Sequence, residues 1–493
     1  MTRAFVLPAV LALAGCTALA PVNPRIDHVD LDGGYRVGNR IRHTHAAKND
    51  PDTLFLLTFS GGGTRAAAFS YGVLEELRRT NIQVDGRNVN LLNEVDAIAG
   101  VSGGSFTALA YALYGEKLFT EYESRFLKRD VQGALTSRVL NPLNWFALGS
   151  GLYGRSEMAA DYYDEILFHG ATFDDLMDKP TPITAVTGTG LSTGARFQFS
   201  QDHFDLICSD VGKVRLARAA ATSSAVPAVL SPVTYYNYGG SCGAIMPAWV
   251  RDVTRTDSPS RPAGRALLRY RDMASLQDSR NRPYLHVVDG GVSDNLGLRG
   301  LLEAFEELEA SRAYQQQIGL NQLRRIVVVV VNSRSAPDTG WDRRSRAPGI
   351  VSQLFQSSSV PIDHFSSESV ELLKDIAERW ADKRRLEVAE RQLAGMSKAQ
   401  AEASVPRLRF DAIDVSFESI PDPEERHYFM NLPTSFVLPD DAVDRLRELG
   451  GRLLREAPAF RALRQGVAEG GGASSRPRTS PEPSTLDDHV DLP

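Results

Sequence analysis

Residues 53–65, with the sequence TLFLLTFSGGGTR, are the clearest indication of how this chain folds. Residues 53–59 are an almost continuous apolar run of strand length, which is typical of a strand buried on both faces of a parallel sheet. The glycines at 61–63 then form a turn, and residues 64–79 place apolar side chains at helical spacing. Such a turn directs free N–H groups and the positive end of the helix dipole toward an anion, either a phosphate or the oxyanion of a tetrahedral intermediate. Because no Gly-Lys-Ser/Thr follows, it is not a Walker loop.

The same alternation continues along the chain. Further apolar runs of strand length, separated by helical patterns, occur at residues 95–101, 182–186, 285–288 and 326–331. Alternating strands and helices predict an α/β fold with a mainly parallel central sheet flanked by helices. A helical pattern over 363–400, strand-like alternation over 408–420 and an amphipathic pattern over 440–456 predict an α/β C-terminal extension.

Residues 100–104, GVSGG, contain the first reactive side chain. They lie between the apolar run at 95–101 and a helical pattern over 106–118. This is G-x-S-x-G in the strand–turn–helix context of a nucleophile elbow, where a sharp turn exposes the hydroxyl and flanking glycines prevent clashes. Ser102 is therefore the candidate nucleophile.

Residues 287–292, VVDGGV, place Asp289 at the carboxyl end of another buried strand, where open α/β sheets bind ligands. A carboxylate there can be a general base, a metal ligand or a turn cap. A serine nucleophile needs a base, but His286 would face the opposite side of an extended strand from Asp289. His364 and His427 lie in no recognisable motif. A Ser102–Asp289 dyad accounts for this pattern without a histidine.

Composition excludes several classes of protein. The 493 residues include 55 basic and 61 acidic side chains, a net charge of −6, so we expect no nucleic-acid partner. With 42% hydrophobic and 24% charged residues, the chain is neither a multi-span membrane protein nor disordered throughout. Three cysteines exclude a disulfide framework and a four-cysteine zinc site, while pairing of Cys208 with Cys242 stays open. We expect no metal site and no cofactor.

The first residues have the pattern of a targeting segment. Arg3 precedes an apolar run over 4–14, which is shorter than the roughly 20 residues that a spanning helix needs. The sequence Leu-Ala-Gly-Cys at 13–16 resembles the bacterial lipoprotein signal, which implies cleavage after residue 15 and lipidation of Cys16. Thr17 in place of aspartate favours the outer membrane among locations in the cell envelope. Residues 16–50 then predict a lipidated tether in which His43 and His45 are solvated.

Together, SGGGTR, G-x-S-G-G and D-G-G in this order resemble the patatin-like phospholipases, which are lipid acyl hydrolases. Residues 217–227, rich in small side chains and ending in Ala-Val-Pro, and residues 172–176 are similar to further elements of that family. The resemblance covers residues 53–332 and implies a three-layer fold.

Four parts of the chain are predicted beside the signal peptide at 1–15. They are the tether at 16–50, a catalytic domain at 51–345, an extension packing on the core at 346–465, and a disordered acidic tail at 466–493.

The resemblance also assigns roles to residues. Ser102 would be the nucleophile and Asp289 the general base. The N–H groups of Gly61, Gly62 and Gly63 would form the oxyanion hole, and Arg65 would help to stabilise the oxyanion. The implied activity is hydrolysis of fatty-acyl esters of membrane phospholipids or lysophospholipids through an acyl-enzyme. Ala66 stands where many members have glycine, a small change from which we expect little effect.

Two alternatives remain open. One is an α/β-hydrolase type of esterase with a Ser-Asp-His triad, in which His364 or His427 is the base. The other is a non-catalytic envelope lipoprotein that binds lipid on a hydrolase scaffold. Intact Ser102, Asp289 and glycine loop favour an enzyme over the second alternative.

Overall fold

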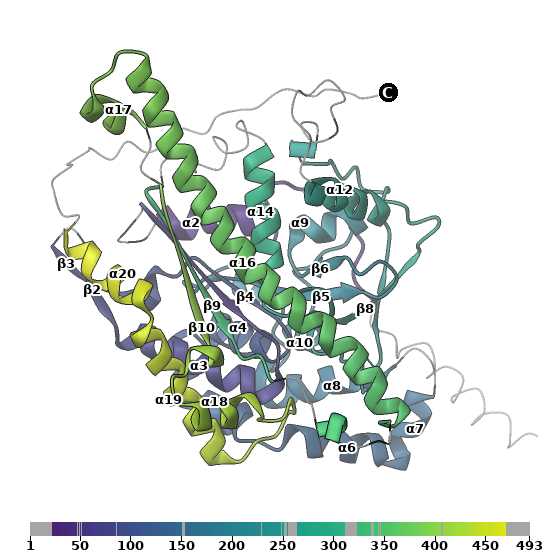
Figure 1. Ribbon diagram of the computed structural model, residues 1–493. Helices are drawn as coiled ribbons and strands as arrows, with labels where there is room; N and C mark the ends of the chain where they lie inside the picture. The colour runs from purple at the N-terminus through teal and green to yellow at the C-terminus, as the bar shows by residue number, and fades with distance from the viewer. Residues whose placement is uncertain are drawn as a thin grey trace, which may run out of the picture.

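The computed structural model describes residues 22–469 except 47, 49, 51, 85, 150–152, 228, 248, 251–253, 255–263, 311–322, 337–339, 344, 346 and 406–407. Its centre is an eight-stranded sheet with the order β10-β9-β1-β4-β5-β8-β7, in which β6 also pairs with β5 (Figure 1). The strands are β1 (Thr53–Phe59), β4 (Ala97–Gly100), β5 (Ile183–Gly190), β6 (Arg196–Gln198), β7 (Val233–Tyr236), β8 (Tyr284–Asp289), β9 (Arg325–Asn332) and β10 (Arg409–Ser416). A separate antiparallel hairpin consists of β2 (Asn81–Val84) and β3 (Arg87–Asn90).

Most of the sheet is parallel, which confirms the predicted fold class. The strands β10, β9, β1, β4 and β5 run in one direction. The run at 285–288 predicts another strand of the same kind, whereas β8 is antiparallel to β5 and to β7. An apolar run reports burial on both faces and carries no information about direction, which explains the difference.

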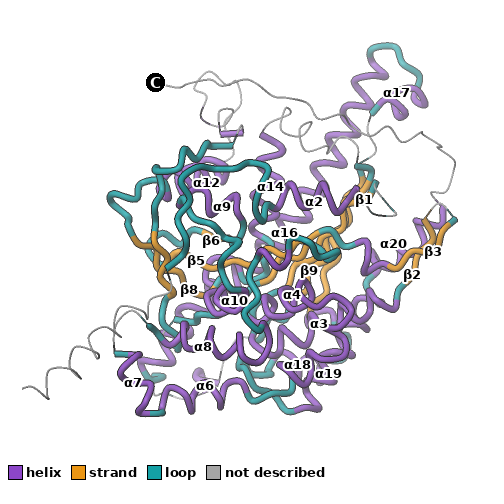
Figure 2. Tube along the Cα trace, turned by 180° about the vertical axis from the view of Figure 1, so that it is seen from behind, coloured by secondary structure: helices purple, strands orange, loops and turns teal. Residues whose placement is uncertain are grey.

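Helices cover both faces of the sheet, so the molecule has three layers. Alternate residues of β1 divide between two hydrophobic clusters, with Leu57 in one and Leu56 in the other. The first cluster is closed by α3 (Gly63–Arg79), α4 (Gly103–Tyr114), α10 (Leu216–Ser223) and α19 (Asp440–Glu456). The second is closed by α14 (Arg299–Ala310) and α16 (Ile350–Leu393), and α16 crosses the front of the sheet in Figure 1. Figure 2 shows α3, α4 and α10 from the opposite side.

The other α-helices and short helical turns lie around these layers. The α-helices are α2 (Val37–Ala46), α5 (Leu118–Tyr122), α6 (Val131–Leu140), α7 (Pro142–Leu148), α8 (Arg155–Tyr163), α9 (Gln201–Phe204), α12 (Gly264–Leu276), α13 (Gly291–Asp294), α17 (Lys398–Ser404), α18 (Pro423–Met430) and α20 (Pro458–Glu469). The short turns are η2 (Leu91–Glu94), η3 (Gly115–Lys117), η4 (Glu123–Leu127), η5 (Asp164–Phe168), η6 (Asp174–Leu176), η7 (Asp205–Ile207), η9 (Gly340–Arg343) and η10 (Phe417–Ser419). None of the helices in the described part is long and apolar enough to cross a bilayer.

The N-terminal segment is packed on the domain from Asn23 onward, which corrects the prediction of a tether. The side chain of Asn23 is buried and donates to Ser209 Oγ at 2.9 Å. Arg36 is also buried and forms an ion pair of 2.7 Å with Asp205. His45, expected to be solvated, hydrogen-bonds Asp96 at 3.0 Å. The partners of these side chains lie far along the chain, so local composition could not reveal them. Residues 1–21, including Cys16, lie outside the described residues.

The C-terminal extension is part of the same three layers. β10 pairs with β9 from Arg409↔Arg325 to Ser416↔Asn332, and α19 packs along α3. The helical pattern at 363–400 corresponds to the long α16 and to α17, which begins after the capping box of Ser397 and projects from the body (Figure 1). α20 continues through residues 466–469, where the sequence predicts a disordered tail. The rest of that tail lies outside the described residues.

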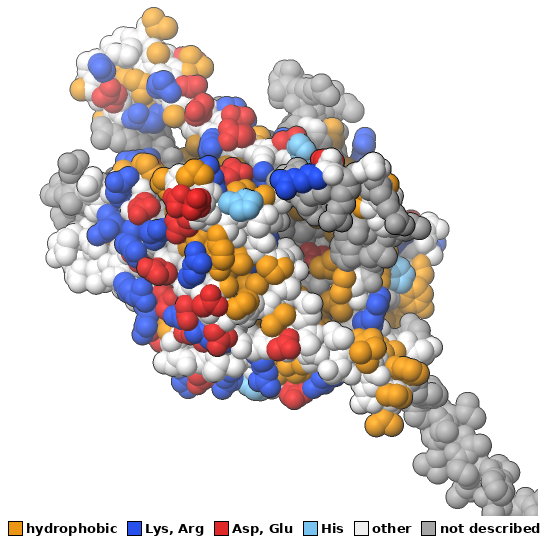
Figure 3. Space-filling model, turned by 60° about the horizontal axis from the view of Figure 1, so that its bottom comes forward, with side chains coloured by type: hydrophobic (Ala, Val, Ile, Leu, Met, Phe, Trp, Pro, Cys, Tyr) orange, Lys and Arg blue, Asp and Glu red, His pale blue; other side chains and the backbone are white. Residues whose placement is uncertain are grey.

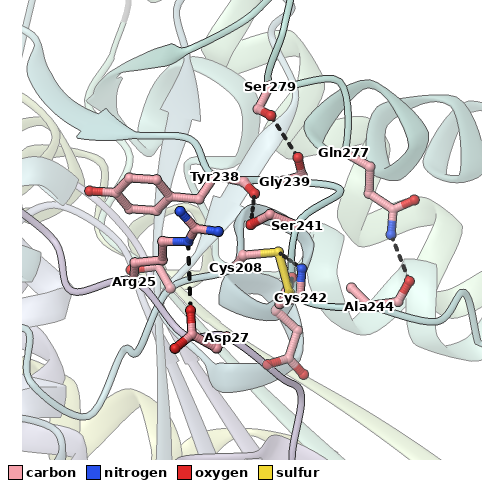
Figure 4. The surroundings of a disulfide bond; sticks show 12 residues. Arg25, Asp27, Cys208, Tyr238, Gly239, Ser241, Cys242, Ala244, Gln277 and Ser279 are labelled. Atoms are coloured by element: carbon pink, nitrogen blue, oxygen red, sulfur yellow. Dashed lines mark hydrogen bonds and ion pairs between the residues drawn. A yellow bond between two sulfur atoms is a disulfide. The ribbon is translucent and has the colours of Figure 1, made fainter.

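The structure pairs the two cysteines whose pairing the sequence left open. Cys208 and Cys242 form a disulfide that joins the end of η7 to the loop after β7 (Figure 4). Around it, Ser279 Oγ donates to the carbonyl of Gly239, and Gln277 donates to that of Ala244. The disulfide therefore lies within a loop region that is also held by backbone-directed hydrogen bonds.

Part of the surface is hydrophobic. Leu140 at the end of α6 and Leu143 and Trp145 in α7 are exposed, and Leu143 is 87% exposed. Figure 3 shows the molecule turned so that the bottom of Figure 1 comes forward. On this face, charged side chains of both signs are mixed at the left, and hydrophobic side chains gather in the centre and at the lower right.

Candidate active site

Ser102 lies at the sharp turn between β4 and α4, as the G-x-S-x-G pattern predicts. Its backbone has φ 47° and ψ −120°, a conformation that is strained for any residue except glycine. The two residues after it must be glycine because the chain is crowded there. A Cβ at Gly103 would lie 2.1 Å from the carbonyl oxygen of Gly63, and a Cβ at Gly104 would lie 2.6 Å from that of Phe59.

Asp289 reaches Ser102 because β5 is longer than its parallel neighbour. β5 pairs with β4 through Val186 and then continues, and its continuation pairs with the antiparallel β8 so that Asp289 lies opposite Gly188. The last residue of β8 therefore ends beside the turn that follows β4. Ser102 Oγ donates to Asp289 Oδ2 at 3.0 Å.

Both residues are held by hydrogen bonds from their surroundings. The N–H of Gly291 donates to Asp289 Oδ1 at 2.7 Å. The N–H of Ser102 donates to Ser223 Oγ at 2.9 Å, and the N–H of Asp289 donates to the carbonyl of Ala225 at 3.0 Å. Residues 223–225 thus link the two candidate catalytic residues, and they belong to the small-residue segment at 217–227.

Burial changes the acid–base behaviour of Asp289. Only 6% of the residue is exposed, and burial raises the pKa of its carboxyl group to about 7, while the hydrogen bonds from Gly291 and Ser102 lower it. A carboxylate with a pKa near neutral pH can both accept and return a proton under physiological conditions. The arrangement can therefore activate the hydroxyl of Ser102 without a histidine.

The glycine loop presents two free N–H groups near the serine. The N–H groups of Gly62 and Gly63 have no hydrogen-bond partner within the described part of the chain, and Gly63 is the first residue of α3. The N–H of Gly61 instead donates to the carbonyl of Asn295 at 2.8 Å. This corrects the prediction that all three glycine N–H groups are available for an oxyanion. Because Asn295 comes from a distant segment, no local pattern signals this contact.

Arg65 points into the protein and is 2% exposed. Its Nε donates to the carbonyl of Ser333 at 2.9 Å, its Nη1 to the carbonyl of Leu432, and its Nη2 to Thr434 Oγ1 at 3.1 Å. All three guanidinium nitrogens therefore bind protein acceptors. The role in oxyanion stabilisation that the resemblance implies for Arg65 stays a prediction.

No histidine with a described side chain hydrogen-bonds Ser102 or Asp289. His286 binds Thr234 Oγ1 at 3.0 Å, and His427 binds Asn431. His364 is exposed on α16. His203 is buried with its ring against Phe197, and burial holds its pKa well below the usual range. The triad alternative thus lacks a positioned base among these residues.

A metal has no evident site in the described residues, since no group of three or more His, Cys, Asp or Glu side chains there can hold one.

The candidate active site also includes residues that the sequence analysis did not identify, namely Asn295, Ser333 and the segment at 432–435. They carry no motif, and only their contacts with the glycine loop identify them.

The chain is similar to known proteins in sequence and in structure. A family model described as patatin-like phospholipase matches residues 57–302. Among solved structures, human GIVD cytosolic phospholipase A2 is similar with 12% identity and a TM-score of 0.39, covering 88% of this chain and 62% of that chain. VipD from Legionella pneumophila is similar with 11% identity and a TM-score of 0.24, covering 81% of this chain and 67% of that chain. This chain thus spans about three fifths of the human enzyme (62%). Among curated proteins, none matches.

Proposed function

The chain belongs to the patatin-like phospholipases through residues 57–302, and we propose that it is a serine acyl hydrolase acting on fatty-acyl esters of phospholipids or lysophospholipids. The observation that carries the proposal is the hydrogen bond of 3.0 Å from Ser102 Oγ to Asp289 Oδ2, at a strained turn beside the free N–H groups of the glycine loop. Nucleophile, base and oxyanion donors are the three parts that acyl transfer to water requires.

The reaction proceeds in two halves. Ser102 Oγ attacks the ester carbonyl carbon while Asp289 takes the hydroxyl proton, and the carbonyl oxygen becomes an oxyanion facing the N–H groups of Gly62 and Gly63. The tetrahedral intermediate expels the alcohol, which receives the proton from Asp289, and an acyl-enzyme remains. Water then gives a proton to Asp289 and attacks the acyl carbon. Collapse of the second intermediate releases the fatty acid and returns the proton to Ser102.

Location at the cell envelope is a second part of the proposal. Cleavage before Cys16 and lipidation of that residue would anchor the domain to a membrane, and Thr17 favours the outer membrane. The disulfide between Cys208 and Cys242 supports an oxidising compartment. The exposed Leu140, Leu143 and Trp145 support contact with lipid at the substrate surface. Labelling cells with an alkyne fatty acid should tag the wild type and fail to tag the Cys16→Ser variant; equal tagging of both would overturn the anchor.

The activity is tested with a fluorescent fluorophosphonate, which phosphonylates activated serines. We expect labelling of the wild type and none of Ser102→Ala, and strongly reduced labelling of Asp289→Asn. His364→Ala and His427→Ala should label like the wild type. Loss of labelling in either histidine variant, with circular dichroism unchanged, would favour a triad. Absence of labelling in folded wild-type protein would favour a non-catalytic lipid-binding lipoprotein.

A further inference from the structure

The glycine loop is held by a segment that lies far outside the residues matched by the family model. Residues 431–439, which we call the connector, join α18 to α19. The N–H of Thr64 donates to the carbonyl of Ser435 in the connector at 2.8 Å. Arg65 donates to Thr434 Oγ1 at 3.1 Å and to the carbonyl of Leu432. The first turn of α3 therefore has three hydrogen bonds to the connector.

The backbone of the connector also touches the glycine loop directly. A Cβ at Gly63, where φ is +62°, would lie 2.3 Å from the carbonyl oxygen of Ser435. No side chain fits between the two segments, so the position of Ser435 limits where Gly63 can lie. The free N–H of Gly63 is a candidate oxyanion donor. The connector therefore contacts a residue that would itself touch the reacting atoms.

Arg65 ties the connector to a second support of the loop. Its Nε donates to the carbonyl of Ser333, which follows β9. The N–H of Ser333 donates to Ser60 Oγ at 2.9 Å, and Ser333 Oγ donates to the carbonyl of Gly61 at 3.1 Å. The guanidinium group thus lies between the loop, the end of β9 and the connector.

The connector is itself held in place by contacts with other parts of the domain, so it can fix the position of the glycine loop. The ring of Phe436 packs 5.5 Å from that of Phe106 on α4, the helix that follows Ser102, and 6.3 Å from that of Phe126. The N–H of Phe436 donates to Gln132 Oε1 at 3.1 Å, and the N–H of Gln132 donates back to the carbonyl of Phe436 at 3.2 Å. The connector therefore contacts both the nucleophile helix and the oxyanion helix.

We propose that the connector sets the position of the oxyanion-hole N–H groups, and that Thr434, acting through Arg65, is a positioning residue for catalysis. The inference rests on the proposed hydrolase activity and adds a device from outside the matched domain. Donors to a developing oxyanion act through prior alignment, so a small shift of Gly62 and Gly63 weakens stabilisation of the transition state while leaving ester binding unchanged.

Thr434 allows a clean test because the residue is exposed and its replacement should not disturb the core. Thr434→Val keeps the shape of the side chain but removes the acceptor for Arg65, whereas Thr434→Ser keeps the acceptor. On a soluble short-chain ester we expect kcat of Thr434→Val to fall about tenfold with KM unchanged, and Thr434→Ser to recover most of the loss. Thr120→Val, an exposed threonine on α5, is the matched control.

Two further measurements separate positioning from a general structural role. Affinity for a trifluoromethyl ketone, whose serine adduct carries an oxyanion, should fall in Thr434→Val by the same factor as kcat. If Thr434 acts through Arg65, the double variant Arg65→Lys/Thr434→Val should be no slower than Arg65→Lys alone. Multiplicative losses in the double variant, or a Thr434→Val enzyme with wild-type kcat, would overturn the proposal.

Failure of the proposed activity would be recognised separately. If wild-type protein shows no turnover that depends on Ser102, the hydrolase assignment fails, and amide hydrogen exchange then decides the positioning claim alone. Exchange at residues 60–66 should be faster in Thr434→Val than in wild type and Thr120→Val, with exchange in β9 unchanged. Equal exchange at residues 60–66 in all three proteins would refute the proposal.

Discussion

At the scale of single residues, the site depends on a strained backbone and a buried carboxyl group. The positive-φ conformation of Ser102 costs on the order of 1–3 kcal/mol and persists because neighbouring contacts define it. Its N–H is bound by Ser223 Oγ, and its carbonyl accepts from Ser105 Oγ at 2.6 Å. The conformation aims the hydroxyl at Asp289, whose pKa of about 7 makes it a base matched to neutral pH.

The pKa of Asp289 predicts how activity depends on pH. The carboxyl group must be ionised to accept the proton of Ser102, so kcat/KM should rise with pH through about 7 and level off above it. Below that value it should fall about tenfold for each pH unit. A pH–rate profile on a soluble ester measures this, and a midpoint near 4 would mean that burial does not control the base.

Stability should change with pH in the opposite direction. Because folding raises the pKa of Asp289 from 3.8 to about 7, its contribution to stability is fully present below the lower value and is lost as pH rises through the higher one. Removing the charge in Asp289→Asn should therefore raise the free energy of unfolding at pH 8 relative to wild type, by up to about 4 kcal/mol, and much less at pH 5. Urea unfolding at both pH values measures the difference, and an equal effect at both would contradict it.

At the scale of elements, two helices cross without side chains between them. α3 and α19 meet at Gly72 and Gly450, where a Cβ would lie 2.0 Å from the carbonyl oxygen of Arg447 and 2.4 Å from that of Phe69. Such a close approach lets α19 cover the same hydrophobic cluster that α3 closes. Since α3 begins at the glycine loop and α19 follows the connector, this crossing also contributes to where the glycine loop and the connector meet.

We expect Gly72→Ala to destabilise the protein by about 1–3 kcal/mol, because the added methyl group must push two packed backbones apart. Gly38→Ala is the matched control, since it lies on the exposed face of α2 with nothing within 4 Å of the new Cβ. Thermal unfolding of both variants checks the expectation. A Gly72→Ala protein as stable as Gly38→Ala would show that the crossing is not tight.

At the scale of the whole molecule, residues 346–469 are not a separate appendage. β10 forms the edge of the central sheet, α16 covers its front face, and α19 covers its back face. The N-terminal segment packs on the same folded unit through the hydrogen bond of Asn23 to Ser209 and the ion pair of Arg36 with Asp205. The folded unit is therefore larger than the residues 57–302 that the family model matches.

A chain ending at residue 345 should therefore fail to fold, although it contains the whole family match. It would lack the buried side chains of Leu373, Val443 and Leu446. The edge of β9 and the apolar faces that α16 and α19 cover would then be exposed to solvent. A chain ending at residue 469 should express and unfold like the full-length protein. Solubility and circular dichroism compare the two, and a soluble, cooperatively folded shorter chain would contradict this view of the molecule.

The elements differ in how far local sequence could predict them. The periodicity of residues 64–79 and 440–456 predicts α3 and α19 almost to the residue, because apolar spacing within one helix is a local property. The direction of β8 and the docking of residues 22–46 were not predictable in this way, since their partners lie far along the chain. The same holds for Gly61, whose N–H is occupied by Asn295.

The chemistry of the site follows from short motifs whose residues are adjacent in the chain. Strand, glycine turn and helix are consecutive in the chain, so local sterics alone place Ser102 at an elbow and open α3 with free N–H groups. The contact between Ser102 and Asp289, across a separation of 187 residues, and the support of the glycine loop by the connector instead depend on how distant elements pack. This packing also decides the pKa of Asp289, because burial is produced by the packed layers together and cannot be read from any one segment.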